Sequence, residues 1–126
     1  MDKNELKQLL ESYVYDVQYL REKSQEIEFI NKLKNEGDAE VINQALEQEK
    51  TKIAKIMNKK KNIENLFDSL NQPYHTVMYL RYIRSFNFDQ IAHKMDYSTK
   101  RIYQLHSEAI NKILSKINNN EIEINK

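Results

Sequence analysis

The sequence predicts an all-α protein, and three observations support this expectation. The 126 residues include one Gly and one Pro, so few positions suit tight turns or hairpins. Lys, Glu, Asn, Ile and Leu dominate the composition, which favours long helices. Apolar residues recur at steps of three and four along most of the chain, which is the period of an amphipathic helix.

The composition also excludes several classes of protein. Without Cys, the chain has no disulfide framework and no thiolate metal site. The mean hydropathy of -0.83 leaves no apolar run able to span a bilayer, and the first five residues lack the apolar stretch of a secretory signal. We therefore expect a soluble, cytoplasmic protein with no cofactor and no membrane partner.

The net charge of +1 conceals an uneven distribution along the chain. Residues 1–49 hold twelve acidic and six basic side chains, a net charge of -6, whereas residues 50–126 hold seven and fourteen, a net charge of +7. This asymmetry indicates a polyanionic partner for the second half. The alternative is that solvent-exposed helix faces differ in the sign of their charge without binding any polyanion.

The first expected element is one long helix from Leu6 to about Leu33. It should end at Asn35, Glu36 and Gly37, where the Gly can adopt the left-handed C-cap conformation and Asp38 can cap the next helix. The apolar positions that define its stripe are Leu6, Leu9, Leu10, Tyr13, Val17, Leu20, Ile27 and Ile30.

A second long helix is expected from Ile42 to Leu70, with only Glu49 and Lys60 interrupting an apolar stripe that steps by four and three. The two helices should pack as an antiparallel, coiled-coil-like hairpin over residues 1–72, serving dimerisation or partner binding. A core formed within one chain and a core formed in a homodimer would bury the same apolar stripe. The pattern therefore does not distinguish a monomer from a homodimer.

A new unit, residues 73–117, is expected to begin at Pro73, which suits the first turn of a helix. A helix should run to about Arg84, with Val77, Leu80 and Ile83 on one side, and break at residues 85–87. Asn87 and Gln90 have the spacing of a capping box, which predicts a short helix over residues 88–95.

A turn and a longer helix follow. Asp96 tolerates the left-handed backbone that a tight turn at Asp96 and Tyr97 requires, and Ser98 should cap a helix that continues to about Ile117. Its inward positions should be Ile102, Leu105, Ala109 and Ile113. Residues 118–126 are expected to form a flexible tail.

A short helix, a tight turn and a longer helix have the spacing of a helix-turn-helix, whose second helix lies in the major groove of DNA. Ile91, Ala92 and Met95 should meet Ile102 and Leu105, and Ala92 is small enough for the backbones to approach. The outward face of the second helix would then contact bases, with Gln suited to adenine and Lys to guanine. The candidate base contacts are Thr99, Lys100, Tyr103, Gln104 and Ser107.

Basic and polar residues around this unit are candidates for phosphate contacts, which supply affinity but little sequence information. These candidates are Arg81, Arg84, Lys94, Ser98, Arg101 and Lys112. The basic run from Lys50 to Lys61 spans more than one face of its helix, and a solvated face is the slightly better interpretation than contact with flanking DNA. The three histidines lack ligand spacing, so we expect no metal site, and His106 is the one placed near the nucleic acid.

The stretch FDQIAHKMDYSTKRIYQLHSEAINKIL, residues 88–114, closely resembles region 4 of sigma-70-type factors, and VMYLRYIRSF, residues 77–86, resembles the helix that leads into it. With its helical first half, the chain is similar to ArpU/RinA-like phage and prophage regulators of late transcription, which lack the promoter-melting region of a true sigma factor. Thr99 and Tyr103 stand where housekeeping sigma factors usually carry arginine, and Lys100 stands where they usually carry an acidic residue. The resemblance thus implies an operator other than the usual sigma promoter element.

The expected function is sequence-specific binding of double-stranded DNA by a transcription regulator, an activator of phage or prophage type, which could also contact RNA polymerase. No nucleophile elbow or phosphate-cradling Gly loop can be identified, so enzymatic activity is not expected. Two alternatives remain. One is a DNA-packaging adaptor resembling a small terminase subunit, and the other is a module that docks on RNA polymerase without touching DNA.

Overall fold

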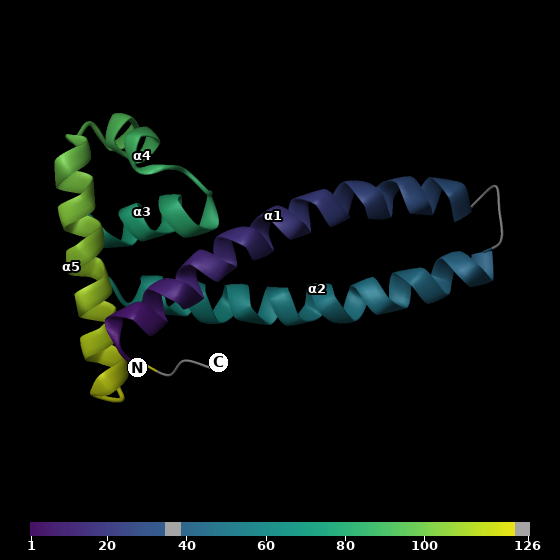
Figure 1. Ribbon diagram of the computed structural model, residues 1–126, viewed down its shortest axis with the longest axis horizontal. Helices are drawn as coiled ribbons and strands as arrows, with labels where there is room; N and C mark the ends of the chain where they lie inside the picture. The colour runs from purple at the N-terminus through teal and green to yellow at the C-terminus, as the bar shows by residue number, and fades with distance from the viewer. Residues whose placement is uncertain (35–38, 123–126) are drawn as a thin grey trace.

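The computed structural model describes the backbone of residues 1–34 and 39–122, and within these ranges the regular structure is entirely helical. Two long helices are followed by a compact group of shorter ones (Figure 1). In chain order the elements are α1 (Lys3–Lys34), α2 (Ala39–Asp68), α3 (Tyr74–Met78), the π-helix η1 (Tyr79–Ile83), α4 (Phe88–Met95) and α5 (Thr99–Asn118). The predicted all-α fold is therefore confirmed.

Helices α1 and α2 lie side by side and antiparallel, forming the long arm of the molecule (Figure 1). Polar side chains join them along their length. Lys59 Nζ donates to Asp16 Oδ2 at 2.7 Å, and further out the Tyr19 hydroxyl donates to a carboxylate oxygen of Glu49. The predicted corner with its Gly37 C-cap and Asp38 N-cap lies outside the described residues, as do the side chains of Ile27, Ile30 and Ile42.

The base of the hairpin shares one apolar core with the second half of the chain. Leu6, Leu10 and Tyr13 of α1 are fully buried there against α2, η1 and α5. We call this the junction core, and it draws residues from both sides of the predicted division at Pro73. Its buried members are Leu6, Leu10, Tyr13, Val17, Ile63, Leu66, Phe67, Leu70, Met78, Tyr82, Ile83, Ala109, Ile110 and Ile113.

The helix predicted from Pro73 to Arg84 begins at Tyr74 and changes to a π-helix at Tyr79. The wider turn is visible in the bond from Arg84 N to Tyr79 O, five residues earlier, at 3.1 Å. This helix lies between two cores, with Met78 and Tyr82 in the junction core and Leu80 in the second core described below. The apolar stripe in the sequence predicted neither the change to a π-helix nor the contact with two cores.

The local signals around α4 and α5 are all present. Asn87 Oδ1 accepts from Gln90 N at 2.8 Å and Gln90 Oε1 accepts from Asn87 N at 2.9 Å, which completes the capping box. Asp96 has φ 59° and ψ 44°, the left-handed conformation expected of the turn, and Ser98 Oγ accepts from Arg101 N at 3.1 Å. The break before α4 also uses a left-handed residue, Ser85 with φ 59°, which we did not predict.

Beyond α5, the described part of the predicted tail forms a turn. Glu121 N donates to Lys116 O at 2.8 Å, and Ile122 packs partly buried against the junction core. None of the helices in the described ranges combines the length and the apolar character needed to cross a membrane.

Candidate nucleic-acid interface

A second apolar core holds α4 against the first half of α5. Ile91, Ile102 and Leu105 are fully buried in it, Ala92 is 5 % exposed, and Met95 packs at its edge. Val77 and Leu80 close the core from α3 and η1. These are the contacts that the sequence predicted between the two helices of a helix-turn-helix. The core orients α5 so that its opposite face points outward.

The outward face of α5 carries the predicted base contacts, all of them on the helix and none fully buried. Lys100, Tyr103 and Gln104 are exposed, with 55 % of the Tyr103 side chain accessible, while Thr99 and Ser107 are half-buried. This face is therefore open to a partner along at least two turns of the helix.

Neighbouring side chains restrict the motion of this face. Thr99 Oγ1 donates to Asp89 Oδ1 at 3.0 Å, and the Tyr103 ring stacks on Phe88 with 4.4 Å between ring centroids. Arg101 Nη1 donates to Gln104 Oε1 at 3.4 Å, an exposed contact that a base edge can displace. Helix α4 thus positions two of the five predicted base contacts before any ligand binds.

Ser107 lies where α1 meets α5. Its Oγ accepts a hydrogen bond from Lys3 Nζ at 3.4 Å, across 104 residues of sequence. No local sequence pattern relates positions so far apart, so the contact between the first turn of α1 and this face was not predicted.

Four of the predicted phosphate contacts carry exposed side chains around the unit: Arg84, Lys94, Arg101 and Lys112. Lys94 lies over the Phe86 ring at 5.5 Å and Lys112 over the Tyr74 ring at 5.0 Å, so aromatic rings support their stems. Arg101 also lies 3.8 Å from Glu108, an exposed pair of little energetic weight. Ser98, the fifth, is exposed at the N-cap of α5.

Arg81 has a different environment from the other predicted phosphate contacts. Its side chain is 19 % exposed, and its guanidinium lies 3.5 Å from a carboxylate oxygen of Glu11 and 3.4 Å from the Phe86 carbonyl. The guanidinium also lies over the Phe88 ring at 5.2 Å. Arg81 therefore already joins α1, η1 and α4.

His106, which we placed near the nucleic acid, lies half-buried between α5, η1 and α4. Its Nε2 is 2.7 Å from the Tyr82 hydroxyl, and Phe88 contacts it edge-on at 5.1 Å. Burial, aided by the nearby charges of Lys7, Arg81 and Lys3, lowers the pKa of His106 to about 4. Burial also raises the pKa of Tyr82 above its ordinary range. Tyr82 therefore donates and a neutral His106 accepts.

The other two histidines lie on different helices. His75 Nε2 is 3.3 Å from Asp68 Oδ1 and its ring stacks on Tyr79, whereas His93 is exposed on α4. Among the described residues, no three His, Asp or Glu side chains come together as a metal site would require.

Most of the basic run on α2 contacts other side chains of the hairpin. Lys59 pairs with Asp16 at 2.7 Å and Lys60 with Glu64 at 3.6 Å, while Lys52 lies over the Tyr19 ring at 4.2 Å. Lys50 pairs with Glu47 at 3.1 Å. These contacts favour the interpretation of the run as a solvated face that stabilises the hairpin.

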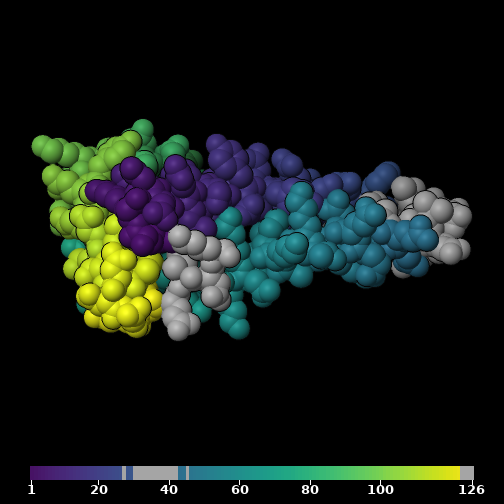
Figure 2. All heavy atoms as spheres, turned by 60° about the horizontal axis from the view of Figure 1, so that its bottom comes forward, coloured from purple at the N-terminus to yellow at the C-terminus, as the bar shows by residue number. Residues whose placement is uncertain are grey.

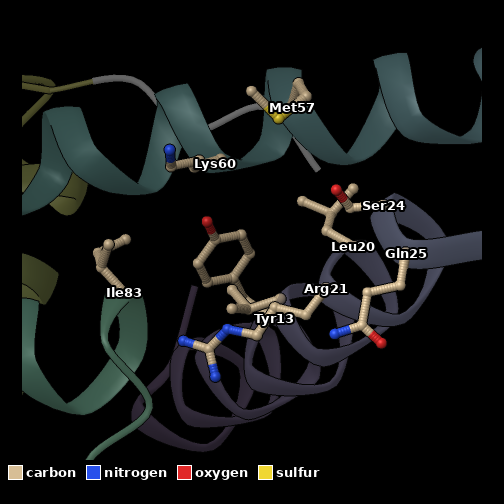
Figure 3. Close-up of a pocket in the computed structure, with 9 residues that line it drawn as sticks. Tyr13, Leu20, Arg21, Ser24, Gln25, Met57, Lys60 and Ile83 are labelled. Atoms are coloured by element: carbon tan, nitrogen blue, oxygen red, sulfur yellow. The ribbon is translucent and has the colours of Figure 1, made fainter. Parts of the chain in front are cut away.

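A groove of about 500 Å³ opens between α1 and α2, on the side of η1 (Figure 3). Val17, Leu20 and Ile83 contribute apolar surface, Arg21 and Lys60 supply positive charge, and Met57 at its edge is 47 % exposed. The groove belongs to the hairpin and is separate from the outward face of α5.

Fold and geometry together define a helix-turn-helix with an accessible polar face on its second helix. Residues 66–113 match the family model described as Sigma-70, region 4. No curated protein and no solved structure matches the chain. The matched part, from the end of α2 to most of α5, is a sigma-70 region 4-like helix-turn-helix of the kind found in DNA-binding regulators.

Proposed function

We propose that this protein is a sequence-specific regulator of transcription that binds double-stranded DNA, and that it acts as an activator in a phage or an integrated element. The observation that carries the proposal is the outward face of α5, where Lys100, Tyr103 and Gln104 are exposed on a helix whose opposite side is fully packed. Core packing does not require polar side chains at Lys100 and Gln104, whereas Tyr103 also stacks on Phe88. The resemblance to ArpU/RinA-like regulators supports the finer role.

In this proposal the first two turns of α5 enter the major groove. Gln104 can form paired hydrogen bonds with adenine, and Lys100 can donate to the two acceptors of guanine. Thr99, Tyr103 and Ser107 complete the reading face. Contacts with phosphates come from the ends of the unit and hold α5 in register: Arg84, Lys94, Ser98, Arg101 and Lys112. Arg81 contributes by holding the elements together through Glu11 and Phe88.

A gel-shift series tests this assignment. Replacing Gln104 or Lys100 by Ala should relax sequence preference, since each good base contact contributes about 1–3 kcal/mol of discrimination. Replacing Arg84 or Arg101 by Gln should weaken binding to all duplexes and lower its salt dependence. Four variants that all behave like the wild type would contradict the proposal, and so would the absence of any shift at low salt, which would favour a protein-docking module.

We also propose that the hairpin joins two copies of the chain. One recognition helix reads few base pairs, and paired helix-turn-helix units gain specificity by reading two half-sites about one helical turn apart. Helices α1 and α2 carry exposed apolar side chains that a monomer does not use, with Tyr15, Phe29 and Met57 at 72 %, 62 % and 47 % exposure.

Light scattering after size-exclusion chromatography tests the dimer directly. The wild type should have twice the mass of one 15.2 kDa chain, and Phe29→Glu or Met57→Glu should shift it toward the monomer without unfolding it. A wild-type monomer at micromolar concentration would contradict the dimer and favour RNA polymerase as the hairpin's partner. A large ring would favour the DNA-packaging alternative.

A further inference from the structure

We propose that the first two turns of α1 form part of the DNA interface, with Lys3 and Lys7 binding phosphates beside the bases that α5 reads. This inference rests on the proposed function, because it extends the same interface. It adds a segment that precedes the matched region by more than fifty residues and that carries no helix-turn-helix pattern.

Lys3 and Lys7 lie beside the recognition face of α5. Lys3 Nζ donates to Ser107 Oγ at 3.4 Å, and Ser107 lies on the same face of α5 as Lys100, Tyr103 and Gln104, one turn beyond Gln104. Figure 2 shows the first turns of α1 packed against α5. Leu6 and Leu10 anchor this contact, since both are fully buried in the junction core with Ala109 and Ile110.

Lys7 lies one helical turn after Lys3, on the same flank of α1. Its side chain is exposed, and of the charges that lower the pKa of His106 its effect is the largest. The next position of this flank is Glu11, whose carboxylate lies 3.5 Å from Arg81. The flank that faces α5 thus holds two lysines side by side, followed by an acidic residue that already has a partner.

Within the residues that the structure describes, the two lysines have no carboxylate partner. Neither Lys3 nor Lys7 lies within ion-pair distance of a carboxylate in residues 1–34 or 39–122. Asp2, the acidic residue before them, caps α1 by accepting from Glu5 N at 2.8 Å. By contrast, Lys59 and Lys60 on α2 each have a carboxylate partner.

Duplex DNA supplies the missing negative charge at this place. When the leading end of a recognition helix lies in the major groove, the positions one turn further along it approach the sugar-phosphate backbone at the groove edge. A cation held beside Ser107 would therefore meet phosphates that flank the bases read by Lys100 and Gln104. Such contacts add affinity and salt dependence, and no sequence preference.

The test compares two full-length double variants that lose the same charge. Lys3→Gln/Lys7→Gln removes the proposed contacts. Lys55→Gln/Lys61→Gln is the control, because both its lysines are exposed on α2 and make no ion pair within the described residues. Binding of a selected duplex is measured by fluorescence anisotropy between 50 and 300 mM salt, with thermal unfolding as a check on the fold.

We expect the Lys3/Lys7 variant to lower the slope of log K against log salt by about two, since each phosphate contact contributes about 0.9. Affinity should fall on the order of tenfold while the preferred sequence stays the same. The control should leave slope and preference unchanged. Equal slopes for the two variants, with wild-type binding intact, would overturn this inference alone. A wild-type chain that binds no duplex would overturn the proposed function as well.

Discussion

The basic residues of the hairpin and those of the helix-turn-helix have different surroundings. On α2, Lys52, Lys59 and Lys60 lie against an aromatic ring or a carboxylate of the hairpin. Around α5, Lys100 and Arg84 are exposed and form no ion pair within the described part of the chain. The number of positive charges therefore does not identify the nucleic-acid surface. Lys55 and Lys61 on α2 are exposed as well, so what distinguishes the surface of α5 is that Lys100 lies beside the exposed side chains of Tyr103 and Gln104 on one face of the helix.

The two regions also differ in how completely their apolar residues are buried. The helix-turn-helix core is small and complete, with Ile91, Ile102 and Leu105 fully buried. The hairpin is buried at its base, where Leu6 and Phe67 are inaccessible, yet it exposes Phe29 and Met57 further along. One region thus has a closed core and an open polar face, and the other has paired charges and exposed apolar positions. This contrast supports assigning DNA to the first and a protein partner to the second.

The largest effect is expected where the two regions meet, at His106. Its folded pKa of about 4 lies below the ordinary value of 6.5, so the unfolded chain binds the proton more readily. Stability should therefore fall as the pH drops from about 6.5 to about 4, by on the order of 3 kcal/mol at the lower end, and should not depend on this group above pH 7.

Urea unfolding of the wild type and of His106→Gln, at pH 7 and at pH 4.5, isolates this group from the carboxylates. Gln retains an acceptor for the Tyr82 hydroxyl, which lies 2.7 Å from His106 Nε2. The basic groups whose charges act on His106 are Lys7, Arg81 and Lys3. Identical losses of stability in the two proteins would contradict a neutral, half-buried His106.

A smaller loss of stability is expected when a larger side chain is placed between α4 and α5. Ala92 is 5 % exposed in the helix-turn-helix core, so Ala92→Leu should force the two helices apart and cost about 1–3 kcal/mol. DNA binding should weaken in parallel, because the outward face of α5 depends on this packing.

The matched control is Ala54→Leu, at an exposed position of α2, where a change within about 0.5 kcal/mol is expected. Thermal unfolding of both variants measures the difference. An Ala92→Leu protein as stable as the control would show that the two backbones do not approach closely at Ala92.

The smallest effects should separate a paired cation from an unpaired one. Lys59→Gln removes the contact with Asp16, so it should cost less than about 1 kcal/mol of stability and leave the salt dependence of DNA binding unchanged. Arg84→Gln should do the reverse, with stability preserved and the salt slope lowered by about one. Anisotropy titrations measure the salt dependence of DNA binding and urea unfolding measures stability, each on both variants. A lowered salt slope in Lys59→Gln together with an unchanged slope in Arg84→Gln would contradict the contrast between the two regions.

Sequence reasoning recovered the elements whose signals are local. The capping box of Asn87 and Gln90, the left-handed Asp96 and the N-cap Ser98 each act within four residues, and the structure shows all of them. The inward positions Ile102 and Leu105 followed from the period of the helix and are fully buried. These signals also determine which residues of α5 face outward.

The features that the sequence did not reveal depend on distant partners. Arg81 was predicted to bind phosphate, but its contact with Glu11 spans seventy residues, and the contact between Lys3 and Ser107 spans 104. The π-helix at Tyr79–Ile83 lies in a short helix that contacts two cores, and one of these cores forms only when α1 packs against α2, η1 and α5. A periodic pattern shows which side of a helix is apolar, but it does not show which partner covers that side.

The most direct test of the central claim is selection of bound duplexes from a random library, carried out with the wild type and with Gln104→Ala. We predict that the wild type enriches one defined site, and that the variant enriches the same site with relaxed preference at one or two adjacent base pairs. No enrichment by the wild type, or an unchanged preference in the variant, would contradict the reading of bases by the outward face of α5.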